Sequence, residues 1–162
     1  MSANSAAHHR VVIVGAGSGG LCMGMQLRKA EMDDFVILEK GNGVGGTWYH
    51  NSYPGAECDV QSHLYSFSFE PKLDWSQPFA GQAEILEYLN HCADKYNLRP
   101  NIRFDTKVEA TTWSDDDGHW TVTTADGSIL TADVVVSAIG MFNNIVWPKI
   151  DGMDEFKGDS FH

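Results

Sequence analysis

The stretch that decides the fold is Val11-Val-Ile-Val-Gly-Ala-Gly-Ser-Gly-Gly20, an aliphatic run that passes directly into a glycine-rich loop. Four aliphatic residues without polar alternation are typical of a strand that is buried on both faces. Apolar residues recur through residues 18–30 and predict a helix, and residues 35–38 form a second aliphatic run. This order predicts two parallel strands joined by a crossover helix. The helix should bury Leu21, Cys22, Met25 and Leu27.

The rest of the chain predicts further α/β structure. Residues 85–96 carry an amphipathic helical stripe, and residues 102–104 can form a third parallel strand. The period then changes to two, so residues 108–113, 119–124 and 128–131 are expected to form an antiparallel meander. Residues 134–138 return to the aliphatic style of a buried parallel strand. The expected fold class is therefore α/β, with a Rossmann-like parallel sheet, crossover helices and an antiparallel β-meander.

Composition excludes several classes of function. The 162 residues carry 11 basic and 22 acidic side chains, for a formal net charge of -11, and the basic residues are dispersed. A nucleic-acid footprint needs a clustered basic face, so no nucleic-acid partner is expected. The N-terminus resembles neither a signal peptide nor a membrane span, and three scattered cysteines do not form a disulfide framework. We expect a cytoplasmic protein with no membrane contact, and the histidine and cysteine spacing predicts no metal.

The first glycine motif, Gly15-x-Gly17-x-x-Gly20, lies where a strand passes into a helix. In that position it lets a pyrophosphate approach backbone N–H groups at the helix N-terminus, and a side chain at Gly15 or Gly17 would obstruct the approach. Glu39 ends the second strand 19 residues after Gly20, where a carboxylate can accept both hydroxyls of an adenosine ribose. The motif alone would also suit a plain tight turn, and Glu39 a solvated strand end. Ser18 and Lys40 adjoin these positions and complete the first candidate site.

An acidic residue at position 39 disfavours a ribose that carries a 2′-phosphate, so the residues favour NAD or FAD without deciding between them. The next segment adds a second pattern. It reads Gly45-Gly-Thr-Trp48, then Tyr53-Pro-Gly-Ala-x-x-Asp59, then Tyr65. This segment resembles the N-terminal part of type I Baeyer–Villiger monooxygenases, which belong to the flavin-containing monooxygenase superfamily.

The resemblance implies FAD as the bound cofactor and NADPH as a second one whose site lies mostly outside this chain. It places the glycine pair that contains Gly46, together with Trp48, beside the flavin, and it gives Asp59 and Tyr65 contacts to FAD. Thr47 and Tyr53 belong to the same pattern and are also expected to bind the cofactor. The residue matching Asp59 also lies near the nicotinamide, so Asp59 is the expected catalytic residue. Val108 matches a position whose backbone meets the adenine. Gly140 and Met141 end a stretch, Ser-Ala-Ile-Gly-Met, that is similar to a second flavoprotein fingerprint.

The chain closes on Phe156-x-Gly158-x-x-x-His162, the opening of the family fingerprint Phe-x-Gly-x-x-x-His-x-x-x-Trp. We therefore expect a flexible tail at residues 1–9, the N-terminal part of a FAD-binding domain at 10–150, and at 151–162 the start of a linker toward an NADP-binding domain. On this interpretation the fold is incomplete at its C-terminal end. The resemblance covers the chain from about residue 11 to its end.

The implied activity is NADPH- and O2-dependent oxygenation of a small-molecule ketone or related substrate to an ester or lactone, with the 162 residues alone expected to be inactive. Four alternatives stay open: an N- or S-oxidising flavin monooxygenase, an NAD-dependent dehydrogenase, a non-catalytic dinucleotide-binding module, and a disulfide reductase. The last class needs two cysteines close together after the glycine pair, and here Cys58 has no second cysteine near it. Neither the substrate nor the oligomeric state can be predicted from these residues.

Overall fold

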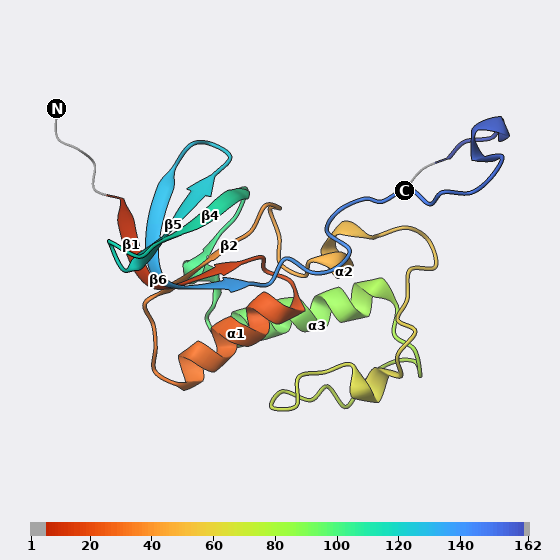
Figure 1. The fold of residues 1–162 in the computed structure, drawn as a ribbon. Helices are drawn as coiled ribbons and strands as arrows, with labels where there is room; N and C mark the ends of the chain where they lie inside the picture. The colour runs from red at the N-terminus through yellow and green to blue at the C-terminus, as the bar shows by residue number, and fades with distance from the viewer. Residues whose placement is uncertain (1–5, 161–162) are drawn as a thin grey trace.

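A computed structural model describes residues 6–160, whose strands form one six-stranded sheet in the order β3-β2-β1-β6-β5-β4 (Figure 1). The strands are β1 (Ala7–Val14), β2 (Phe35–Leu38), β3 (Ile102–Arg103), β4 (Val108–Ser114), β5 (His119–Thr124) and β6 (Ile129–Ser137). The strands β3, β2, β1 and β6 are mutually parallel, whereas β6, β5 and β4 form an antiparallel meander. The predicted α/β class, with its parallel sheet and its meander, is confirmed.

The helices are α1 (Ser18–Lys29), α2 (Thr47–His50) and α3 (Gln82–Lys95), with 3-10 turns η1 (Ser62–Leu64), η2 (Arg99–Asn101) and η3 (Met153–Glu155). In Figure 1, α1 and α3 lie together on one side of β1 and β6, and the β4–β5 hairpin rises on the other side. No helix within residues 6–160 combines the length and apolar character needed to cross a membrane.

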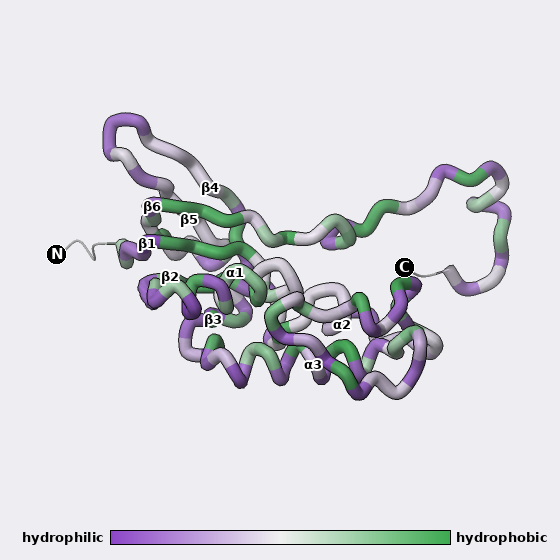
Figure 2. Tube along the Cα trace, turned by 90° about the horizontal axis from the view of Figure 1, so that it is seen from below, coloured by the Kyte–Doolittle hydropathy of each residue, from purple (hydrophilic) through white to green (hydrophobic). Residues whose placement is uncertain are grey.

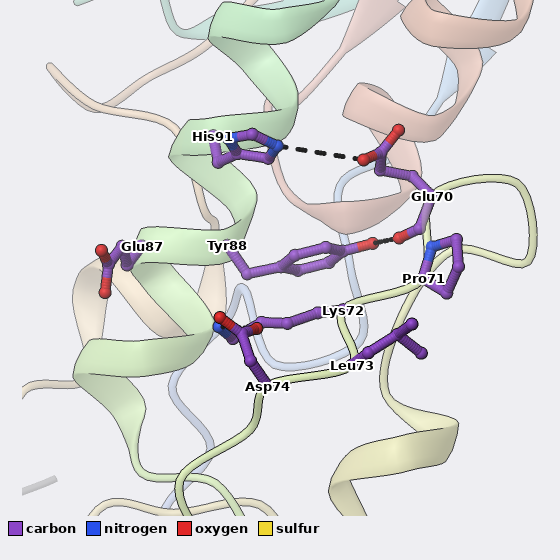
Figure 3. A pocket seen from close by; sticks show the side chains of 8 residues that line it. All are labelled: Glu70, Pro71, Lys72, Leu73, Asp74, Glu87, Tyr88 and His91. Carbon is purple, nitrogen blue, oxygen red and sulfur yellow. Dashed lines mark hydrogen bonds and ion pairs between the residues drawn. The ribbon is translucent and has the colours of Figure 1, made fainter.

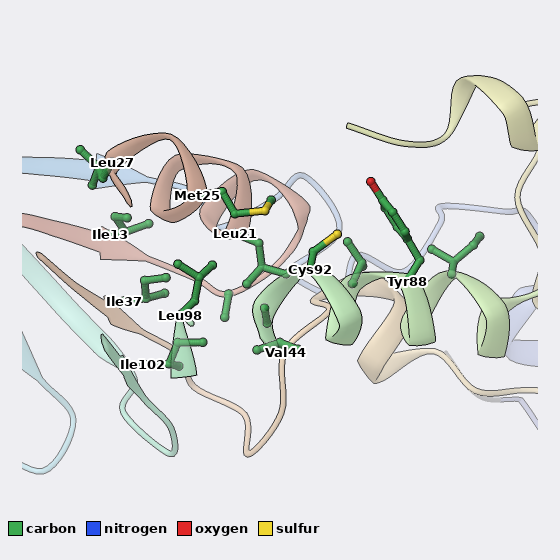
Figure 4. Packing of buried hydrophobic residues seen from close by; sticks show 14 of the residues in the cluster. Ile13, Leu21, Met25, Leu27, Ile37, Val44, Tyr88, Cys92, Leu98 and Ile102 are labelled. Atoms are coloured by element: carbon green, nitrogen blue, oxygen red, sulfur yellow. The ribbon is translucent and has the colours of Figure 1, made fainter. Parts of the chain in front are cut away.

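Strand β1 supplies side chains to two cores because successive residues of a strand point to opposite faces. Val11 and Ile13 pack into the cluster formed with α1 and α3, whereas Val12 packs into a second cluster beneath the meander. Figure 4 shows Ile13 and Ile37 from the strands facing the side chains of α1. Each such fully buried aliphatic side chain contributes roughly 1.5–3 kcal/mol relative to exposure. The run at 11–14 therefore fixes the centre of the molecule.

Strand β6 corrects one sequence-based prediction. Residues 128–131 and 134–138 were expected to be separate strands, but residues 129–137 form one. No glycine or proline interrupts the chain between them. The strand pairs with β5 up to Ala132 and with β1 up to Ser137, so beyond Ala132 only one edge is paired. None of residues 134–138 is fully buried and Val134 is 49% exposed, so the expectation of a buried strand here is wrong.

The N-terminal boundary is also corrected. The flexible tail was expected to reach residue 9, but β1 begins at Ala7 and pairs there with Leu130 of β6. His8 Nδ1 lies 2.9 Å from Thr131 Oγ1, and His9 Nδ1 lies 3.2 Å from Asp34 Oδ1. Strand pairing and these side-chain contacts hold residues 7–9 in the sheet. Of the rest of the expected tail, residue 6 is exposed and lies outside the strand, and residues 1–5 lie outside the described residues.

Candidate functional site

Residues 15–20 comprise the turn between β1 and α1 and the first three residues of α1, and are called the first glycine loop. Its three motif glycines have different structural reasons. A Cβ at Gly15, where φ is +103°, would lie 2.6 Å from the Ala138 carbonyl oxygen, and one at Gly20 would lie 1.8 Å from that of Gly15. A Cβ at Gly17 would meet nothing closer than the Gly46 Cα at 3.5 Å. Gly15 and Gly20 are therefore required by the fold itself, whereas a methyl group at Gly17 would make only ordinary van der Waals contacts.

This distinction changes the interpretation of Gly15. The sequence suggested that a side chain there would obstruct a ligand, but it would first collide with the backbone at the end of β6. Gly17 differs from Gly15, because its φ of -74° suits any residue and its surroundings have room for a methyl group. A glycine that the fold does not require is consistent with close approach by another molecule.

The N-terminus of α1 is open to an anion. Gly17 is the N-cap, no side chain caps the helix, and its first turn contains no acidic residue. Ser18 is exposed at the first helical position. The first backbone N–H groups of this 12-residue helix therefore have no partner within the helix, and the helix dipole favours a negative group beside them.

Glu39 lies directly behind this turn and is only 4% exposed. Its Oε2 accepts a hydrogen bond from the Ala16 N–H at 2.7 Å, and its Oε1 accepts one from the Gly41 N–H at 2.8 Å. The alternative of a solvated strand end is therefore wrong. Lys40, the next residue, is exposed.

Residues 41–46 form a second glycine loop that packs against the first. The Gly45 N–H donates to the Ala16 carbonyl at 2.9 Å, and a Cβ at Gly46, where φ is +55°, would lie 2.9 Å from the Gly17 Cα. Helix α2 begins at Thr47, which is exposed. The two glycine motifs, separated by about 25 residues in sequence, thus form one surface.

Trp48 and Tyr65 form the aromatic part of the site. The Trp48 Nε1–H donates to the Tyr65 hydroxyl at 3.0 Å, and the rings meet edge to face with centroids 5.8 Å apart. Gln82, at the start of α3, donates from Nε2 to the Trp48 carbonyl. Burial raises the pKa of Tyr65, the Trp48 hydrogen bond acts against this, and negative charge at Cys58 and Asp59 adds to the increase. The phenol therefore keeps its proton and can donate it to a ligand.

Gln82 is a positioning residue that the sequence did not reveal. It follows Trp48 by 34 residues, and nothing in its local pattern distinguishes it from other polar residues at a helix start. Ala16 was missed for a different reason. It contributes backbone groups, which carry no residue-specific signal.

The remaining predicted residues, Tyr53, Asp59, Val108, Gly140 and Met141, lie outside the two glycine loops and the Trp48–Tyr65 pair. Asp59 is exposed, and Tyr53 is 62% exposed. Val108 begins β4, two residues after Thr106, whose N–H donates to the Glu39 carbonyl at 2.8 Å. Gly140, with φ +73°, and Met141, 85% exposed, follow Ala138, whose N–H donates to Val14 at 2.9 Å. Val108 and Gly140 therefore lie within two residues of Thr106 and Ala138, which hydrogen-bond to Glu39 and to the end of β1. The structure shows Tyr53 and Met141 only as exposed side chains.

Two cavities lie along α3. One, of about 240 Å³, is lined by Ser18 and Tyr65 together with residues of η1 and α3, so it adjoins the first glycine loop. The other, of about 390 Å³, lies between α3 and residues 70–74, away from the glycine loops (Figure 3). Its lining includes Glu70, which pairs with Lys95 at 2.7 Å and lies 3.9 Å from His91. The smaller cavity is the one that belongs to the candidate site.

The titratable residues give no competing site. Within residues 6–160 no group of three or more His, Cys, Asp or Glu side chains is arranged to hold a metal ion. Cys22, Cys58 and Cys92 are free thiols. The terminal His162 of the predicted fingerprint lies outside the described residues.

The sequence and the fold are similar to those of known flavin monooxygenases. A Baeyer–Villiger monooxygenase from Streptomyces coelicolor is 49% identical over 96% of this chain, and one from Pseudomonas aeruginosa is 44% identical over 98%. The crystal structure of cyclohexanone monooxygenase from Rhodococcus sp. Phi1 bound to NADP+ superposes with a TM-score of 0.85 at 37% identity over 98% of the chain. In each case the chain spans 30% of the relative's own length.

Residues 12–162 also match a family described as pyridine nucleotide-disulphide oxidoreductase. The match includes both glycine loops, Glu39, the Trp48–Tyr65 pair and all six strands from the second half of β1 onward. It covers more than half of the chain. The chain belongs to the pyridine nucleotide-disulphide oxidoreductase family.

Proposed function

We propose that this chain is the FAD-binding N-terminal portion of an NADPH- and O2-dependent monooxygenase of the Baeyer–Villiger type. The observation that carries the proposal is Gly17, a glycine that the fold does not require, placed at the open N-terminus of α1. A buried carboxylate at Glu39 stands behind it, as an adenine dinucleotide site requires. The similarity to Baeyer–Villiger enzymes supports FAD over NAD and ketone oxygenation over N- or S-oxidation.

The residues present fit FAD. Gly17 and the Ser18 N–H would face the pyrophosphate, and Glu39, with the exposed Lys40 beside it, would face the ribose. Gly15 and Gly20 shape the turn, and Val108 would meet the adenine. Gly46, Thr47, Trp48, Tyr53 and Tyr65, together with Gly140 and Met141, would hold the flavin end. FAD supplies the redox and oxygen chemistry when bound.

The chain's own share of the reaction is to bind and orient. The edge-to-face pair of Trp48 and Tyr65 gives a rigid wall, and the Tyr65 hydroxyl has a proton left to donate. Asp59, which is exposed, would help to position the nicotinamide. This role requires no contact with the first glycine loop. Residues 151–162 would begin a linker to the NADP-binding domain. The whole protein would act in the cytoplasm on a ketone or related small molecule, with no nucleic-acid or membrane partner.

A cofactor titration tests the proposal. When FAD is added to the purified chain, the fluorescence of the flavin should fall as it binds. NAD added at the same excess should fail to displace the bound FAD. Tighter binding of NAD than of FAD would instead favour a dehydrogenase. In a longer protein that contains this sequence, ketone-dependent NADPH oxidation with ester or lactone as product is expected. Bound FAD without that oxidation would favour a non-catalytic module.

A further inference from the structure

Glu39 makes more contacts than a ribose-binding residue needs. One carboxylate oxygen accepts the Ala16 N–H and the other accepts the Gly41 N–H. Its backbone is also paired on both sides, with the N–H donating to the Arg103 carbonyl at 2.9 Å and the carbonyl accepting from Thr106 at 2.8 Å. A carboxylate has about four acceptor positions, so two remain for a ligand. Glu39 therefore joins the two glycine loops to the sheet.

The Ala16 contact reaches the ligand-facing backbone. Ala16 is fully buried between Gly15 and Gly17, and a buried N–H without an acceptor is costly. The Ala16 carbonyl in turn accepts the Gly45 N–H at 2.9 Å. A chain of hydrogen bonds thus runs from Glu39 through Ala16 to the second glycine loop. Fixing Ala16 also fixes the orientation of Gly17, the next residue.

We propose that Glu39 is a positioning residue that holds both glycine loops in their binding shape before any ligand arrives. The proposal rests on the proposed dinucleotide site and goes beyond it. It states that loss of the Glu39 carboxylate weakens binding of the diphosphate itself, and not only of the ribose hydroxyls. Binding energy that would otherwise be spent on ordering the loops is then available for affinity.

The test compares ADP with 2′,3′-dideoxy-ADP, which lacks both ribose hydroxyls. Both are titrated by calorimetry into the parent chain, into Glu39→Gln, and into the control Glu155→Gln, which removes the same charge from an exposed position. Gln keeps the size of the side chain but presents an amide NH2 to one of the two backbone donors. Dideoxy-ADP should bind about tenfold more weakly to Glu39→Gln than to the parent. The control should match the parent.

The outcomes separate the two roles. If Glu39→Gln weakens ADP but leaves dideoxy-ADP unchanged, Glu39 acts only through the ribose and the positioning role is overturned. If both ligands lose the same factor, the positioning role holds and the ribose assignment fails. If neither ligand is affected, both are wrong.

A second measurement uses the unmodified chain and tests the proposal even if Glu39→Gln does not fold. In the unmodified, ligand-free chain, the Ala16 and Gly41 amides should exchange with deuterium at least about tenfold more slowly than in an unstructured peptide. Exchange at the unstructured rate would show that Glu39 does not hold the loops, and would overturn the proposal.

Discussion

The glycine-loop region, residues 11–46, and the C-terminal segment, residues 138–160, meet at one point and are built differently. They meet where the Ala138 carbonyl lies against Gly15. In the first region the side chains of residues 11–13 and 35–38, of Ala16 and Val44 in the loops, and of Glu39 are buried. The second exposes a series of large apolar side chains and runs away from the body of the molecule (Figures 1 and 2). They are Ile139, Met141, Phe142, Ile145, Val146, Trp147, Ile150 and Phe156.

The difference shows which part of the chain is well packed within these residues and which part leaves apolar surface exposed. In the glycine-loop region the close backbone approaches described above are each matched by a glycine or a hydrogen bond. The C-terminal segment has apolar surface of the kind that proteins normally cover. The free edge of β6 beyond Ala132 lies beside it. Substitutions at the closely packed positions of the glycine-loop region should therefore lower the free energy of unfolding, whereas substitutions in the C-terminal segment should mainly change self-association.

The largest effect is expected from Gly20→Ala. The added methyl group would lie 1.8 Å from the Gly15 carbonyl oxygen, so helix and turn must move apart. Overpacking of this kind should lower the free energy of unfolding by about 3 kcal/mol. Denaturant unfolding of the cofactor-free chain measures it. A loss below about 0.5 kcal/mol would mean that the turn is not as tightly closed as described.

A smaller loss is expected from Trp48→Phe, which removes the indole N–H that donates to Tyr65. The hydroxyl of Tyr65 is partly buried, so the free energy of unfolding should fall by about 1 kcal/mol. Trp113→Phe is the matched control, because its indole N–H donates to Asp115 at an exposed position. Equal losses in the two variants would contradict a structural role for the Trp48–Tyr65 pair.

The smallest effect on stability is expected in the C-terminal segment. The double substitution Ile145→Ser and Val146→Ser replaces side chains that are 64% and 74% exposed. The free energy of unfolding should change by less than about 0.5 kcal/mol, while self-association at high concentration should fall. Sedimentation velocity and denaturant unfolding measure the two quantities. A loss of stability with unchanged association would show that this segment packs on its own chain.

Much of the fold could be predicted because its signals are local. The aliphatic runs at 11–14 and 35–38 and the stripe on α3 have the expected periods, and each forms the expected element. The error in β6 arose because one continuous strand pairs with β1 along residues 130–137 and with β5 only along 129–132, so no turn residue marks where the pairing with β5 ends.

The candidate site was predicted less completely, because its contacts join residues that are far apart in the sequence or use backbone groups. Glu39 was expected at a strand end, but its bonds to the Ala16 and Gly41 backbone leave no trace in side-chain identity. The Gln82 contact to Trp48 joins residues 34 apart. Gly15 and Gly17 look alike in sequence, and only their surroundings in the fold distinguish them. A Cβ at Gly15 would collide with the Ala138 carbonyl oxygen, whereas one at Gly17 would make only an ordinary contact with Gly46.

The central claim is that the backbone at Gly17 is a binding surface, and Gly17→Ala tests it most directly. The methyl group meets no atom closer than 3.5 Å, so thermal unfolding of the cofactor-free variant should match the parent. Its FAD affinity, measured by fluorescence titration, should fall at least about tenfold, which corresponds to about 1.4 kcal/mol. A folded Gly17→Ala chain that binds FAD as tightly as the parent would contradict the account.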